Sequence, residues 1–118
     1  MATTTVTRKK IKRGDTWKAT YSWFQGNYPL DLTSATVRLQ LRAKQTYALA
    51  LSISTDSGEL TIPNPGNGQV VQEVPAADME AVDPAVYWCD IEVSLPGGTV
   101  RSSETFEVEV EQDIAFDE

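Results

Sequence analysis

The sequence has no histidine and one cysteine, Cys89, among its 118 residues. Histidine is the usual general base and a common metal ligand, so its absence removes the simplest basis for acid–base or metal-assisted catalysis. A lone cysteine excludes a disulfide within the chain and a zinc site built from cysteines. We therefore expect that the protein is not an enzyme, binds no cofactor or metal and acts on no small-molecule substrate.

Long apolar segments are also missing. No apolar run approaches the roughly 20 residues that a membrane helix requires. Residues 1–10 combine threonines with basic residues and contain no apolar segment, which is not typical of a secretory signal peptide. We expect no membrane partner, and synthesis in a cytoplasm.

The charges are unevenly distributed along the chain, whose net charge is -7. Residues 1–44 carry nine basic and two acidic side chains, whereas residues 45–118 carry one basic and fifteen acidic side chains. An asymmetry of this kind indicates attraction between the two parts, either within one molecule or between copies.

Apolar and polar residues alternate in five segments of the chain. A period of two is typical of strands that turn one face to a core and the other face to water. The segments are 17–23, 37–42, 49–53, 87–95 and 106–111. Five such segments in a chain of this length predict an all-β protein.

Turn-forming residues separate these segments. They lie at 26–29, 56–58, 64–68 and 96–98. Short strands spaced in this way predict an immunoglobulin-like antiparallel β-sandwich of about seven to eight strands, with at most one short helical turn, over residues 76–81. The length is near the commonest domain size, so we expect residues 1–118 to form a single domain with terminal arms at 1–6 and 112–118.

The alternation also separates an expected core from an expected surface. Inward positions should pack between two sheets, whereas Phe24 and Trp88 fall on outer faces, where exposed aromatic rings can stack on sugars. The expected core residues are Trp17, Tyr21, Trp23, Val37, Leu39, Leu41, Tyr87, Cys89, Ile91, Val93, Phe106 and Val108.

A tyrosine two residues before a cysteine is typical of a corner in immunoglobulin-type sandwiches, where the hydroxyl bonds back to the main chain. Tyr87 precedes Cys89 in this way, but there is no second cysteine for a disulfide between the sheets. We predict that Tyr87 anchors such a corner. Cys89 should be a buried, unreactive thiol, because apolar surroundings disfavour the thiolate.

A basic run lies near the start of the chain and an alternating acidic run near its end. Clustered cations can bind nucleic acid, but no aromatic residues interleave with the basic run and the protein as a whole is acidic, so we expect no nucleic-acid partner. If the first and last strands are neighbours, the two runs would pair within one molecule. Alternatively, the basic edge of one subunit would meet the acidic edge of the next. The candidate assembly contacts are both terminal arms and Arg8, Lys9, Lys10, Lys12, Glu107, Glu109 and Glu111.

Three short motifs carry a resemblance to a known family. Residues 13–16 read R-G-D-T, residues 29–37 read P-L-D-L-T-S-A-T-V, and residues 85–93 read A-V-Y-W-C-D-I-E-V. Together they resemble the N-terminal immunoglobulin-like domain of phage baseplate upper proteins and related small virion proteins. That family reads approximately P-L-D-L-T-G-A-T-V in the second motif and G-x-Y-x-x-D-I-x-V in the third. The resemblance spans the chain from about Ile11 to Val110.

The resemblance implies a structural protein of a phage particle, located in the virion after synthesis in the host bacterial cytoplasm. It implies a place in the tail, baseplate or neck, and partners among other virion proteins and copies of the chain itself. The alternatives are a capsid decoration protein and a carbohydrate- or receptor-binding module. Arg13-Gly14-Asp15 also spells a tripeptide that integrins bind, but we interpret it as a turn before a strand that starts near Trp17.

Overall fold

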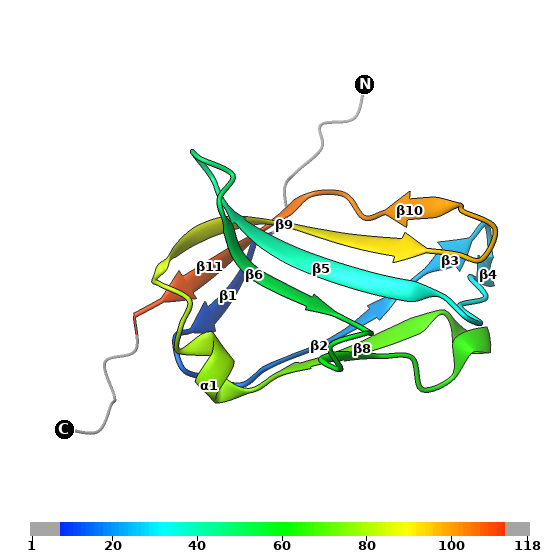
Figure 1. The fold of residues 1–118 in the computed structure, drawn as a ribbon, viewed down its shortest axis with the longest axis horizontal. Helices are drawn as coiled ribbons and strands as arrows, with labels where there is room; N and C mark the ends of the chain where they lie inside the picture. Colours follow the sequence, from blue (N-terminus) through cyan, green and yellow to red (C-terminus); the bar gives the residue numbers. More distant parts are fainter. Residues whose placement is uncertain (1–7, 113–118) are drawn as a thin grey trace.

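The computed structural model describes residues 8–112, which form two packed β-sheets and a small hairpin (Figure 1). The large sheet has the strand order β1-β11-β9-β5-β6, with β10 also paired to β9. Its strands are β1 (Arg8–Lys12), β5 (Thr36–Ala43), β6 (Leu49–Ser54), β9 (Ala85–Ser94), β10 (Val100–Ser102) and β11 (Phe106–Glu111). The small sheet has the order β2-β8-β7, and β3 pairs with β4. These strands are β2 (Trp17–Ser22), β3 (Phe24–Gln25), β4 (Tyr28–Pro29), β7 (Leu60–Thr61) and β8 (Gln69–Val74).

The predicted all-β, immunoglobulin-like sandwich is confirmed, with differences in detail. Eight strands have three or more residues, and β3, β4 and β7 have two. The helix α1 (Ala76–Met79) confirms the predicted helical turn, but the structure adds a 3-10 turn, η1 (Pro65–Asn67), which the sequence did not indicate.

The pairing of β1 with β11 is parallel. The chain leaves β1 for the small sheet instead of returning beside it, so nothing imposes the antiparallel direction there.

The core lies between the two sheets and depends on the alternation in β5 and β9. These two strands pair in register over eight residues, from Thr36 opposite Ser94 to Ala43 opposite Tyr87. Their inward side chains are almost fully buried, and each such aliphatic side chain contributes roughly 1.5–3 kcal/mol by leaving water. The buried inward residues of the pair are Val37, Leu39, Leu41, Tyr87, Cys89, Ile91 and Val93.

Three residues that were expected in the core are only partly buried: Tyr21, Trp23 and Phe106. The Lys9 ammonium group lies 5.1 Å from the centre of the Tyr21 ring and 5.6 Å from the centre of the Phe106 ring. A lysine stem can cover apolar surface while its charge stays in water. Lys9 thus covers a ring of the small sheet and a ring of the large sheet, and a charged side chain takes the place that an apolar one would have in a larger core.

The path of the chain changes sheet after β2. The Trp23 N–H donates to Gly68 O at 2.8 Å, and the Leu30 N–H donates to Trp23 O at 2.9 Å. Gly68 approaches so closely that a Cβ atom on it would lie 2.5 Å from Trp23 O. This close backbone contact ends the regular strand at Ser22 and starts the β3–β4 hairpin.

The predicted tyrosine corner is confirmed. The Tyr87 hydroxyl donates to Asp83 O at 2.6 Å. Cys89 is fully buried, as predicted, and burial raises the pKa of its thiol to about 12. A thiol with that pKa is almost entirely protonated at neutral pH, so it is a poor nucleophile.

The Arg13-Gly14-Asp15 segment is a turn, as predicted. Gly14 has a positive φ of 87°, and the Asp15 N–H donates to Lys12 O at 3.1 Å. The Arg13 side chain is held against the body of the domain, because its Nε donates to Glu80 O at 2.9 Å. The tripeptide therefore joins β1 to β2.

The predicted terminal arms, 1–6 and 112–118, lie outside the described residues except for Gln112. In the part of the chain from 8 to 112, no helix is long and apolar enough to cross a membrane.

Candidate functional site

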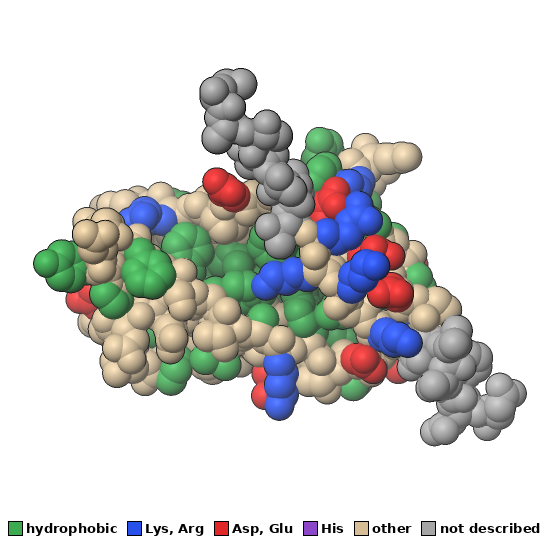
Figure 2. Space-filling model, turned by 180° about the vertical axis from the view of Figure 1, so that it is seen from behind, with side chains coloured by type: hydrophobic (Ala, Val, Ile, Leu, Met, Phe, Trp, Pro, Cys, Tyr) green, Lys and Arg blue, Asp and Glu red, His purple; other side chains and the backbone are tan. Residues whose placement is uncertain are grey.

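The basic and acidic runs lie side by side on neighbouring strands. The register of β1 and β11 places Arg8 opposite Glu107 and Lys10 opposite Glu109. Arg8 Nε donates to Glu107 Oε1 at 2.7 Å, and Arg8 Nη1 donates to Glu109 Oε1 at 3.4 Å. Figure 2 shows basic and acidic side chains mixed at one end of the molecule. Of the two alternatives from the sequence, pairing within one molecule is therefore confirmed for the position of the two strands and for the ion pairs of Arg8.

Glu107 lies at the centre of this charge cluster. Lys44 also donates to the Glu107 carboxylate, and the hydrogen bonds from Lys44 and Arg8 hold the pKa of Glu107 below its usual value. Because β11 lies between β1 and β9, the acidic strand forms no separate edge that another subunit could approach. Contact with another molecule stays a prediction for all seven candidate residues, which are Arg8, Lys9, Lys10, Lys12, Glu107, Glu109 and Glu111.

Apolar side chains are exposed at the other end of the molecule (Figure 2). Phe24 on β3 is 55% exposed, Tyr28 on β4 is 77% exposed and Val100 on β10 is 53% exposed. Arg101 links β10 to β3, because its Nη2 donates to Phe24 O at 3.3 Å. The predicted exposure of Phe24 is confirmed.

The two edges of the large sheet differ in charge. β1 reads R-K-K-I-K, and the lysines on such an edge discourage pairing with another strand. β6 reads L-A-L-S-I-S and carries no charged residue. No strand within residues 8–112 pairs with the outer edge of β6.

The hydrogen bonds show which part of the β6 edge is open. The Thr55 N–H donates to Val37 O at 2.9 Å, so by alternation Ile53 and Leu51 bond toward β5, and Ser54 and Ser52 direct their backbone groups outward. The next turn occupies the outward groups of Ser54, because its N–H donates to Ser57 Oγ at 3.0 Å and its carbonyl accepts from the Gly58 N–H at 3.1 Å. Among residues 8–112, the open part of this edge therefore lies at residues 49–52.

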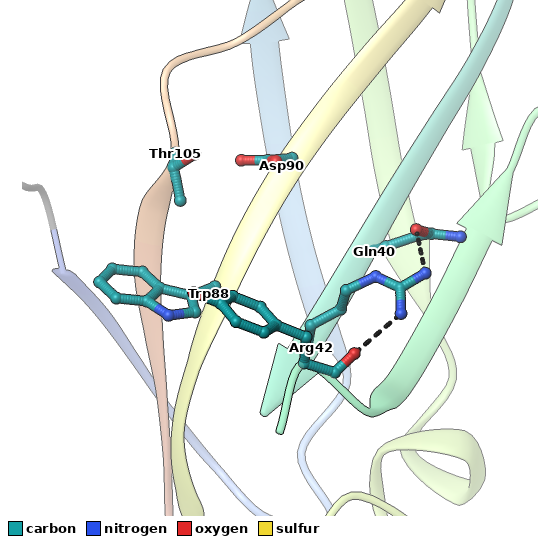
Figure 3. Close-up of a pocket in the computed structure, with 6 residues that line it drawn as sticks. Gln40, Arg42, Trp88, Asp90 and Thr105 are labelled. Carbon is teal, nitrogen blue, oxygen red and sulfur yellow. Dashed lines mark hydrogen bonds between the residues drawn. The ribbon is translucent and has the colours of Figure 1, made fainter. Parts of the chain in front are cut away.

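A concave region lies on the outer face of the large sheet (Figure 3). Its volume is about 410 Å³. Neighbouring strands supply two rows of side chains, with Arg42 opposite Trp88 and Gln40 opposite Asp90. We call this region the outer-face pocket, and its lining residues are Gln40, Arg42, Tyr47, Trp88, Asp90 and Thr105.

Trp88 was predicted to be exposed, but it is half-buried. The Lys44 ammonium group lies 4.2 Å from the centre of the Trp88 ring, a cation–π contact that covers part of the ring. The prediction is wrong in this respect because the alternation places Trp88 on the outer face correctly but says nothing about side chains that fold over that face. The rest of the ring lines the outer-face pocket.

Sequence reasoning missed the other residues of the outer-face pocket. Gln40, Arg42 and Asp90 alternate with core residues of β5 and β9, so the period of two could have placed them on the same face as Trp88. Tyr47 lies in the turn between β5 and β6 and Thr105 lies just before β11. Neither position has a sequence signal that brings it to this pocket.

No protein-family model matches the chain, and no curated protein matches it. Among solved structures, the N-terminal domain of ORF48 of phage TP901-1 is similar with a TM-score of 0.59 and 15% sequence identity, over 87% of this chain and 83% of that chain. CopC from Methylosinus trichosporium OB3b is similar with a TM-score of 0.53 and 7% identity, over 93% of this chain and 89% of that chain. At these identities the similarity is one of fold.

Proposed function

We propose that this protein is a structural subunit of a bacteriophage particle, placed in the tail, baseplate or neck, that works through protein–protein contacts. One observation carries the proposal. Three motifs between Ile11 and Val110 resemble the phage baseplate family, and 87% of the chain is similar in fold to a domain of a phage TP901-1 protein. The partners would be other virion proteins and further copies of this chain.

The surface offers two places for such contacts. The open edge of β6, at residues 49–52, pairs with no strand within residues 8–112, and it carries no charge that would repel an incoming strand. The exposed residues Phe24 and Tyr28 form an apolar tip at the β3–β4 hairpin, and aromatic residues are enriched at protein interfaces. Both features suit docking against a neighbouring subunit.

The proposal includes no catalytic step. The sequence lacks histidine and its one thiol is buried. Within residues 8–112, no group of three or more histidine, cysteine, aspartate or glutamate side chains is arranged to hold a metal ion. The exposed strand edge and apolar tip are features of binding.

The test is whether the chain becomes part of the particle. Phage particles are produced in cells that express the chain with an epitope tag, and the particles are purified on a density gradient. We expect the tag to sediment with intact particles at a fixed copy number. A tag that remains entirely in the free protein fraction would contradict the proposal.

A matched pair of variants tests the role of the β6 edge. Ser52→Lys places a charge on the open edge, whereas Thr36→Lys places the same charge at an exposed position of β5, an interior strand. We expect Ser52→Lys to lower incorporation at least tenfold and Thr36→Lys to leave it unchanged. Equal incorporation of both variants would show that the β6 edge is not an assembly surface. The phage role itself would still be decided by the co-sedimentation experiment.

A further inference from the structure

The outer-face pocket contains two aromatic rings that face a shared concavity. Trp88 rises from β9 (Figure 3), and Tyr47, which lies in the turn between β5 and β6, also lines the pocket. The Tyr47 side chain is 63% exposed. The volume of about 410 Å³ lies within the range of small-ligand sites, roughly 300–1,000 Å³.

Tyr47 holds its position with an unusual backbone. Its φ is 58°, a left-handed conformation that bulky side chains rarely adopt and that recurs at ligand-binding sites. Two hydrogen bonds fix it: its N–H donates to Ala43 O at 2.9 Å, and its carbonyl accepts from Arg42 Nη1 at 2.9 Å. Arg42 thus ties the turn that carries the ring to the floor of the pocket.

The polar groups of the pocket complement the two rings. Arg42 Nη2 donates to Gln40 Oε1 at 3.1 Å, which orients the guanidinium group along the sheet. The Asp90 carboxylate can only accept hydrogen bonds, Arg42 can only donate them, and the Thr105 hydroxyl can do both. A ligand with several hydroxyl groups can satisfy this mixed set.

We propose that the outer-face pocket binds a neutral carbohydrate of one or two sugar rings. A pyranose ring presents C–H groups on its flat faces and hydroxyl groups at its rim. The C–H groups carry a slight positive charge that suits the negative face of an aromatic ring, so the sugar would lie against Trp88 and Tyr47 with its hydroxyls toward Arg42, Gln40 and Asp90.

The charges of the pocket favour a neutral ligand over a phosphorylated or strongly charged one. Asp90 would repel a phosphate, and two of the five Arg42 N–H groups are already bonded to Tyr47 and Gln40, which leaves fewer donors for a phosphate than for single sugar hydroxyls. The Asp90 carboxylate and the Arg42 guanidinium lie on neighbouring strands and carry opposite charges. This inference does not rest on the proposed function, because a pocket can bind a saccharide whether or not the chain belongs to a particle.

The first experiment screens the purified chain on a printed array of neutral mono- to tetrasaccharides, followed by titration calorimetry with each saccharide that binds. We expect binding to at least one saccharide. Trp88→Ala and Tyr47→Ala should each weaken that binding at least tenfold, and Asp90→Asn should weaken it severalfold. Phe24→Ala is the matched control, since it removes an exposed aromatic ring from the β3–β4 hairpin, and it should leave binding unchanged.

Two results would overturn the proposal. The first is the absence of binding to every saccharide on the array, including the case in which a protein partner binds through Trp88 instead. The second is unchanged saccharide binding by both Trp88→Ala and Tyr47→Ala. Thermal unfolding of each variant checks its fold, and Tyr47→Ala keeps the test decisive if Trp88→Ala does not fold, because the Tyr47 ring lies mostly in solvent.

Discussion

The two faces of β9 lie in different surroundings. Its inward residues, Cys89, Ile91 and Val93 among them, are buried between the sheets. Its outward residues, Trp88 and Asp90, line the outer-face pocket. Neighbouring residues of the strand thus belong either to the core or to the proposed binding surface, and substitutions on the two faces should have effects of different kinds.

The largest contrast between the faces should appear in thiol reactivity. Cys89 is fully buried and burial raises the pKa of its thiol to about 12. Because domains of this size are stable by about 5–15 kcal/mol, we expect iodoacetamide at pH 8 to label Cys89 at least ~1,000-fold more slowly than an unfolded thiol. The double variant Cys89→Ala/Asp90→Cys moves the thiol to the outer face, where labelling should be as fast as for a free peptide. Rapid labelling of Cys89 in the native chain would contradict the assignment of the inner face.

The second contrast concerns stability. Ile91→Ala removes a buried side chain from the inner face of β9 and should lower the free energy of unfolding by about 2–5 kcal/mol. Glu92→Ala, the next residue, removes only an exposed ion pair with Arg38 at 3.0 Å and should cost less than about 1 kcal/mol. Urea unfolding measures both. Similar losses for the two variants would show that the faces do not differ as described.

The tyrosine corner should make a smaller contribution to stability. Tyr87→Phe keeps the ring but removes the hydrogen bond to Asp83 O, at 2.6 Å, and should cost about 1–3 kcal/mol. Tyr47→Phe is the control, because it removes an exposed hydroxyl for which no hydrogen bond is found within residues 8–112. If the two substitutions have the same effect on urea unfolding, the corner does not anchor the fold.

The smallest effect should be a pH dependence on the charged outer face. Hydrogen bonds from Lys44 and Arg8 lower the pKa of Glu107 from its ordinary value of 4.5. A lowered carboxyl pKa gives stability that is present above the ordinary pKa and is lost as the pH falls through the lowered one. Glu107→Gln should therefore be less stable than the unmodified chain at pH 7, and the difference should shrink as the pH falls below about 4.5. A stability difference for Glu107→Gln that stays constant as the pH falls would contradict the assignment.

The parts of the fold that follow from local alternation could be predicted from the sequence. β5 and β9 have one face toward the core and one toward water. The Tyr87 corner was predicted from a local pattern, a tyrosine two residues before Cys89. The proximity of the first and last strands was one of two alternatives, because charge alone does not say whether opposite runs meet within a molecule. The parallel direction of β1 and β11 depends on where the chain crosses between sheets, which no local pattern records.

The outer-face pocket was only partly predictable for the same reason. Trp88 was expected to be exposed on the outer face, but Lys44, which directly follows β5, covers part of its ring. Tyr47 enters the pocket because of a positive φ of 58°, and a tyrosine gives no sign of such a conformation, unlike a glycine. Ser34 also has a positive φ, of 60°. It stands in the P-L-D-L-T-S-A-T-V motif, at the position where the resembling family has glycine.

The most direct test of the account is an electron cryo-microscopy map of the phage particle that this chain is proposed to join. We expect density for the two-sheet domain at fixed positions in the tail, baseplate or neck, with the β6 edge or the β3–β4 tip against a neighbouring protein. A particle map at side-chain detail in which no density fits this fold would contradict the central claim.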